Sequence, residues 1–150
     1  MSATPIRLAI VEFQTLFAKA LSSIFSHDTD ITIVGDYRTP VAAQLTAARP
    51  DIVALDIDGQ TTDVAEMIEA CSSAAPNAHV CILSMRVTGE IMQRCLGAGA
   101  DAYIVKDISP AELIRAIKSV AAGETYVDPR VAGGLLRKRS SHAGRADLLI

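Results

Sequence analysis

The sequence has no tryptophan and only three cysteines among its 150 residues, and aromatic residues make up just 4% of it. Half of the chain is nevertheless apolar and 21% is charged, a balance that excludes a disordered chain and predicts a core of aliphatic side chains. Cys71, Cys81 and Cys95 lie in apolar segments without a CxxC pair, which favours buried thiols in a reducing compartment. The length fits a single domain.

The chain also lacks an excess of basic residues and a long apolar run. Its 14 Lys and Arg against 17 Asp and Glu give a net charge of −3, which offers no general attraction to nucleic acid or an anionic membrane. The longest uncharged stretch, Ala70 to Met85, contains Pro76 and falls short of the ~20 apolar residues of a spanning helix. No secretory signal is visible near Met1. We therefore expect a cytoplasmic protein with no membrane partner.

Motifs of several enzyme classes are missing. The first apolar run is followed by Glu12-Phe13-Gln14-Thr15-Leu16, without the glycines that a dinucleotide-binding turn needs. Neither GxSxG nor a P-loop occurs. The histidines, at positions 27, 79 and 142, have no metal-ligand spacing. We therefore do not expect an enzyme.

Five short apolar runs alternate with five helical patterns along the chain. The runs, which we interpret as strands, span 6–11, 31–34, 51–57, 80–83 and 102–105. Apolar residues at helical spacing follow them at 16–25, 41–48, 64–71, 90–98 and 113–121. Helix starts are expected at Thr39, at Thr61 or Thr62, and at Ser109, which opens the capping box Ser109-Pro110-Ala111-Glu112. Gly123 suits the end of the last of these helices.

Apolar strands separated by helices predict an α/β fold, a doubly wound five-stranded parallel sheet with helices on both faces. Ligands of such sheets bind beyond the carboxyl ends of the strands. We divide the chain into a domain over residues 1–126 and a segment over 127–150. The segment begins with a short helix reaching about Leu136 and continues as a basic linker from Arg137.

Polar residues stand at the predicted carboxyl ends of the strands. Glu12 follows the first, Asp56 ends the third with Asp58 just beyond, Ser84 follows the fourth and Lys106 the fifth. A carboxylate can attack phosphorus or hold Mg²⁺, and an ammonium can neutralise a phosphoryl oxygen. Solvated turns and helix caps would use the same residue types, so spacing alone leaves both a phosphate site and plain polar turns open.

Four blocks resemble the receiver domain of bacterial two-component response regulators, most closely those of the NarL/FixJ type. The resemblance runs from about residue 6 to 136, and its blocks are PDIVALD at 50–56, ILS at 82–84, GAGADAYIVKD at 97–107 and SPAEL at 109–113. It implies the flavodoxin-like strand order 2-1-3-4-5. It also implies that Asp56 takes a phosphoryl group from a histidine kinase and that Ser84 and Lys106 contact the phosphoryl oxygens. Tyr103 would be the switch aromatic, or else a plain aromatic residue on an edge strand.

The sequence departs from the family pattern in two places. The family ends its first strand with two adjacent acids, whereas this chain has Glu12-Phe13, and a phenyl ring at a metal-ligand position offers no lone pair to Mg²⁺. The family's Met-Pro-Gly after the acceptor strand is replaced by a segment that begins Asp58-Gly59. Asp58 is either a compensating acid at the metal site or a solvated turn residue. The Mg²⁺ expected for the family should therefore bind weakly or not at all.

Three functions follow from the resemblance. The leading one is an atypical receiver of a transcription regulator, with weak or no Mg²⁺-dependent phosphorylation and output through a homodimer. The alternatives are a conventional phosphoacceptor that takes a phosphoryl group on Asp56 from a histidine kinase, and a stand-alone regulator that binds a protein partner. The basic linker is expected to lead to an absent C-terminal helix-turn-helix domain. DNA binding would belong to that domain, because the three basic residues at 137–139 give only a small counterion contribution.

Overall fold

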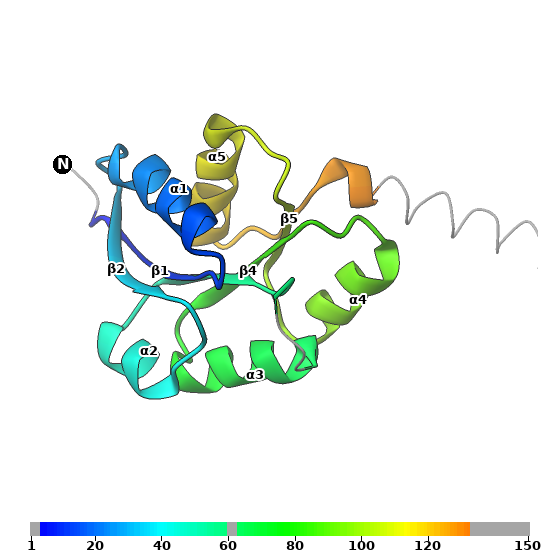
Figure 1. Ribbon diagram of the computed structural model, residues 1–150, viewed down its shortest axis with the longest axis horizontal. Helices are drawn as coiled ribbons and strands as arrows, with labels where there is room; N and C mark the ends of the chain where they lie inside the picture. The colour runs from blue at the N-terminus through cyan, green and yellow to red at the C-terminus, as the bar shows by residue number, and fades with distance from the viewer. Residues whose placement is uncertain (1–3, 60–62, 133–150) are drawn as a thin grey trace, which may run out of the picture.

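A computed structural model describes residues 4–59 and 63–132, whose strands form one parallel sheet in the order β2-β1-β3-β4-β5-β6 (Figure 1). The strands are β1 (Ile6–Val11), β2 (Ile31–Tyr37), β3 (Ile52–Asp56), β4 (His79–Ser84), β5 (Ala102–Val105) and β6 (Tyr126–Val127). The helices are α1 (Thr15–Ser26), α2 (Ala42–Ala48), α3 (Val64–Ala74), α4 (Gly89–Gly97) and α5 (Pro110–Ala121). The predicted doubly wound α/β fold and its order 2-1-3-4-5 are confirmed, with one strand added.

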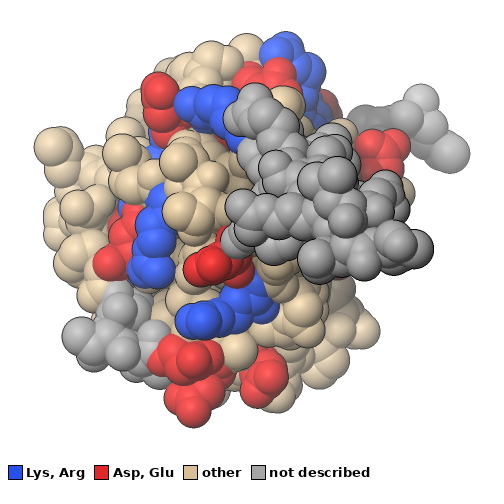
Figure 2. Space-filling view, turned by 90° about the vertical axis from the view of Figure 1, so that its right-hand side faces the viewer, with Lys and Arg blue, Asp and Glu red and all other residues tan. Residues whose placement is uncertain are grey.

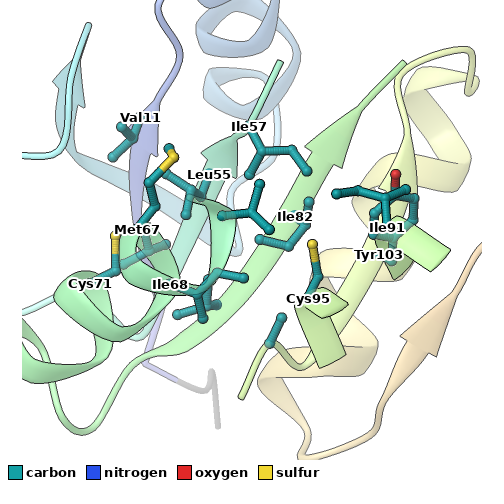
Figure 3. Close-up of a cluster of buried hydrophobic side chains, with 14 of the residues drawn as sticks. Val11, Leu55, Ile57, Met67, Ile68, Cys71, Ile82, Ile91, Cys95 and Tyr103 are labelled. Atoms are coloured by element: carbon teal, nitrogen blue, oxygen red, sulfur yellow. The ribbon is translucent and has the colours of Figure 1, made fainter. Parts of the chain in front are cut away.

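The two faces of the sheet carry separate halves of the core. Successive side chains of a strand point to opposite faces, so in β1 Ala9 and Val11 join one cluster while Leu8 and Ile10 join the other. Helices α1 and α5 cover the face of Leu8, and α2, α3 and α4 cover the opposite face (Figure 1). Figure 3 shows the cluster that contains Val11, in which aliphatic and sulfur-containing side chains of α3 and α4 lie against the strands.

The cap residues of the helices are partly those expected. Ser109 Oγ accepts a hydrogen bond from the Glu112 N–H at 3.1 Å and Pro110 is the first residue of α5, as predicted. Asp63 rather than a threonine caps α3, where its carboxylate accepts from the N–H groups of Ala65 and Glu66; Thr61 and Thr62 lie outside the described residues. The N-cap of α2 is Val41, so Thr39 is not its cap.

The sixth strand corrects the five-stranded prediction. β6 pairs with β5 in parallel, Tyr126 opposite Ala102 and Val127 opposite Tyr103. Two residues are too few to show a strand period, which is why the sequence pattern did not reveal them. The predicted boundary after residue 126 falls inside β6. The helical turn at 129–132 that follows adds Val131 to the core, and the predicted linker from 137 lies outside the described residues.

The three thiols lie inside the molecule. Cys71, Cys81 and Cys95 are buried and free, as predicted, and burial raises the pKa of the Cys71 thiol to about 11. No helix within residues 4–59 and 63–132 is long and apolar enough to cross a membrane. Acidic and basic side chains are interspersed on the described part of the face near α4 (Figure 2).

Candidate functional site

The carboxyl ends of four strands bring the predicted site residues together. β1, β3, β4 and β5 are neighbours in the sheet, so Glu12, Asp56, Ser84 and Lys106 reach one edge. The ladder fixes this register, with Asp56 opposite Leu83 and the Lys106 N–H donating to the Ser84 carbonyl at 2.8 Å. Glu12, Asp56, Ser84 and Lys106 are all buried although they are polar. Buried polar groups need partners: Lys106 forms ion pairs with Glu12 and Asp56, whereas the Ser84 hydroxyl donates to Asp58.

The Lys106 ammonium lies among three carboxylates. Its Nζ is 3.0 Å from Glu12 Oε1, 3.0 Å from Asp56 Oδ1 and 3.5 Å from Asp58 Oδ2. Nζ also lies 4.7 Å from the centre of the Phe17 ring, a cation–π contact that the sequence reading had not anticipated. Burial alone would lower the pKa of Lys106, but its hydrogen bonds and charge interactions with Asp56 and Glu12 raise the pKa above its ordinary value. The lysine is therefore a fixed positive charge.

The two innermost carboxyl groups have opposite pKa shifts. Burial raises the pKa of Glu12 to about 7, and its hydrogen bond with Asp56 adds to this. Burial would also raise the pKa of Asp56, but hydrogen bonds from Glu12, from the Asp58 N–H at 2.9 Å and from Lys106 outweigh it and hold the pKa below its usual range. At neutral pH Asp56 is thus ionised, whereas Glu12 is close to the midpoint of its titration.

Asp58 lies within the pocket, contrary to its reading as a solvated turn residue. Its Oδ1 accepts from Ser84 Oγ at 2.6 Å, and its Oδ2 accepts from the Met85 N–H at 2.8 Å. The Arg86 Nε lies 3.8 Å from Oδ1. Sequence reasoning missed Arg86 and the Met85 amide, because neither belongs to a motif and the backbone amide carries no residue-type signal.

The two departures from the family pattern, Phe13 and the segment that begins Asp58-Gly59, lie next to each other in the structure. A Cβ built on Gly59 would lie 1.9 Å from Phe13 Cδ1, so the Phe13 ring occupies the space where any larger residue at 59 would need its side chain. Phe13 is 41% exposed, so it lies at the surface of the molecule beside Gly59. Phe13, which replaces the family's second acid, therefore directly contacts the glycine that follows Asp58.

Tyr103 is an interior residue and not an aromatic on an edge strand. β5 is flanked by β4 and β6, and the Tyr103 ring is fully buried. Its hydroxyl donates to the Arg86 carbonyl at 2.7 Å, and Tyr103 belongs to the same core cluster as Ile91 (Figure 3). This hydrogen bond links β5 to the segment that follows β4.

The chain's relatives are signalling regulators. The response regulator receiver domain family matches residues 8–118. The chain is 30% identical over 146 residues to the DNA-binding transcriptional activator DevR/DosR of Mycobacterium tuberculosis, covering 96% of this chain and 67% of the relative. It is 26% identical over 145 residues to the response regulator protein VraR of Staphylococcus aureus, covering 95% of this chain and 68% of VraR. The chain thus spans about two thirds of the length of these relatives.

Solved structures share the fold. A two-component response regulator of the LuxR family from Aurantimonas sp. SI85-9A1 gives a TM-score of 0.79 at 20% identity, over 91% of this chain and 99% of that one. A structure of two RcsB dimers bound to two parallel DNAs gives 0.72 at 14% identity, over 86% of this chain and 66% of that one. The family typically binds Mg²⁺ at an acidic pocket. The chain belongs to the response regulator receiver domains, of the type found in two-component transcription regulators of the NarL/LuxR family.

Proposed function

We propose that the chain is an atypical receiver of a transcription regulator, one that is phosphorylated weakly or not at all through Mg²⁺ and that signals by dimerisation. Phe13 carries this proposal. The family's second acid would supply an anionic oxygen there, whereas the ring supplies only carbon and covers Gly59. Mg²⁺ requires near-ideal octahedral coordination by oxygen, so the loss of one ligand weakens its binding.

Most of the remaining carboxylate oxygens already have a partner. The Lys106 ammonium, 3.0 Å from both Glu12 and Asp56, already offsets part of the negative charge of this pocket. Asp58, the candidate compensating acid, accepts hydrogen bonds from Ser84 and Met85. Within the described ranges no three His, Cys, Asp or Glu side chains are grouped to hold a metal ion. Asp56 Oδ2 has no hydrogen-bond partner among the described residues, so a cation could reach this oxygen but would compete with Lys106, Ser84 and Met85 for the others.

A conventional phosphoacceptor is the second candidate, and the state of Asp56 favours it. Its lowered pKa keeps the carboxylate ionised, and Lys106 lies beside it to neutralise an incoming phosphoryl oxygen. In this function Asp56 would take the phosphoryl group from a histidine kinase, with Ser84 as a second phosphoryl contact and Tyr103 as the switch. The two candidates differ in one measurable step, the Mg²⁺-dependent modification of Asp56.

Acetyl phosphate with Mg²⁺ tests that step, with intact mass spectrometry to count adducts. We expect little or no phosphoryl adduct on the wild-type chain within a reaction time that is long enough to phosphorylate a conventional receiver. Phe13→Asp should increase both Mg²⁺ affinity and the yield of adduct at least tenfold, because it restores the missing oxygen ligand.

Two variants serve as controls for that experiment. Phe13→Leu stays apolar and should remain unmodified, whereas Asp56→Asn added to Phe13→Asp should abolish the adduct. Rapid, stoichiometric, Mg²⁺-dependent modification of Asp56 in the wild type would refute the atypical reading and establish the second candidate.

The partners follow from the relatives. DevR/DosR is a DNA-binding activator and RcsB binds DNA as dimers. We infer that this receiver is a non-enzymatic signalling module that forms a homodimer and acts on DNA through a C-terminal domain beyond the segment 127–150. A stand-alone regulator that binds a protein partner is the remaining alternative, and the predicted histidine kinase partner belongs to the second candidate.

A further inference from the structure

Three donors converge on the Asp58 carboxylate. The Ser84 hydroxyl and the Met85 N–H each donate to one of its oxygens, at 2.6 and 2.8 Å, and the Lys106 ammonium lies 3.5 Å from Oδ2. A hydroxyl, a backbone amide and a buried ammonium around one pair of oxygens form a binding site for a phosphate-like anion. An anion arriving beside Asp56 would compete with Asp58 for Lys106, because Lys106 contacts both aspartates.

This contact is made only in the folded chain. Asp58 and Ser84 are 26 positions apart and follow neighbouring strands, so the register of β3 against β4 determines that they meet. The Asp58 carboxylate is also well protected, with its side chain 19% exposed. An anion tethered two residues after Asp56 has a high effective concentration at this position, which an external anion must overcome.

Of these donors, Ser84 is also connected to Tyr103. The Arg86 N–H donates to Ser84 Oγ at 3.0 Å, so the hydroxyl that binds Asp58 also orients the next turn of the chain. The Arg86 carbonyl then accepts the hydroxyl of the buried Tyr103 at 2.7 Å. A continuous series of hydrogen bonds therefore runs from Asp58 through Ser84 and Arg86 to Tyr103.

We propose that Asp58 is an intramolecular ligand of the pocket, whose carboxylate occupies the position of phosphoryl oxygens and, through Ser84 and Arg86, keeps Tyr103 buried without covalent modification. The inference deepens the proposed function and rests on it, because a pocket filled from within neither needs nor readily admits a phosphoryl group. The ligand class that competes with Asp58 is a tetrahedral oxyanion such as inorganic phosphate.

Titration with inorganic phosphate, without Mg²⁺ or a phosphodonor, tests this directly. The full ¹⁵N-labelled chain is followed by NMR at the Met85 amide. Asp58→Ala opens the position, so its dissociation constant for phosphate should be at least tenfold lower than that of the wild type. Asp58→Asn keeps the side-chain shape but removes the charge, and should give an intermediate value. If Asp58→Ala does not fold, as judged by its thermal unfolding, Asp58→Asn carries the comparison alone.

Fluorine-labelled tyrosine provides the second readout. In Asp58→Ala without phosphate, the Tyr103 resonance should move toward that of an exposed tyrosine, and phosphate should reverse the shift; Tyr103→Phe assigns the signal. Glu69→Ala, which removes the same charge from an exposed position of α3, should behave as the wild type. Equal phosphate affinity in the wild type and the Asp58 variants, including no binding by any of them, overturns the inference, as does an unchanged Tyr103 signal.

The two proposals fail separately. Rapid phosphorylation of the wild type would refute the atypical function, whereas the phosphate titration contains no step that forms a covalent bond and reports on Asp58 alone.

Discussion

Glu12 and Asp56 are two carboxyl groups in one pocket with different protonation behaviour. Burial and the hydrogen bond with Asp56 raise the pKa of Glu12 to about 7, whereas Asp56 titrates below its usual range. A carboxyl group whose pKa is higher in the folded chain than in the unfolded chain binds more protons in the folded state. The stability that it contributes is therefore present at low pH and is lost as the pH rises.

The pH dependence of unfolding should show this loss. Between pH 4.5, the ordinary pKa of Glu12, and about 7, the stability of the wild type should fall relative to Glu12→Gln, by at most about 3 kcal/mol. Above pH 8 the difference should be constant, and Asp56 adds no slope in this range because it stays ionised. Urea unfolding at several pH values measures the effect.

The exposed Glu69→Gln serves as the control for charge and should run parallel to the wild type. A difference between the wild type and Glu12→Gln that does not change with pH would contradict the assignment of the proton to Glu12.

At the scale of elements, α5 shows how a local signal positions the site. Ser109 caps the helix three residues after Lys106, and Pro110 fixes its first turn. The reciprocal half of the predicted capping box is replaced by other contacts, since the Glu112 carboxylate accepts from Arg115 and from the Tyr126 hydroxyl. The acid thus connects α5 to β6 instead of closing the cap.

Ser109→Ala should lower the free energy of unfolding by about 1 kcal/mol, because the Glu112 N–H loses its acceptor at the start of α5. Ser73→Ala, an exposed position inside α3, is the matched control and should be neutral or slightly stabilising, since alanine is the better helix former. Urea denaturation compares the two variants. Equal losses at both positions would indicate that the cap contributes nothing.

At the scale of the whole molecule, the expected output is a dimer. If the Asp58 carboxylate occupies the position of a phosphoryl group in the pocket, self-association should be independent of phosphodonor. Analytical ultracentrifugation of the wild type should show a concentration-dependent dimer whose dissociation constant changes less than twofold with acetyl phosphate and Mg²⁺. Phe13→Asp, with its restored acid, should respond to the donor. A wild type that dimerises only with the donor, or stays monomeric throughout, would exclude a donor-independent dimer.

The sequence by itself determined the α/β class, the parallel strand alternation and the four polar residues at the strand ends. These are local properties: an apolar run, a cap such as Ser109, or an acid such as Asp56 at the end of a strand can be recognised within a few residues. Because parallel strands all end at the same edge, Glu12, Asp56, Ser84 and Lys106 were expected there, and the strand order implied by the family resemblance made their strands neighbours.

Only the tertiary structure decided how the pocket is filled. Whether Asp58 faces water or Ser84 depends on the register of β3 against β4, and the two residues are 26 positions apart. The contact of Phe13 with Gly59 and the hydrogen bond from Tyr103 to the Arg86 carbonyl likewise join distant segments. The two residues of β6 form a strand because they pair with β5, and their own hydrophobic pattern does not predict it. Contacts of this kind depend on packing across the sheet, which no short stretch of sequence encodes.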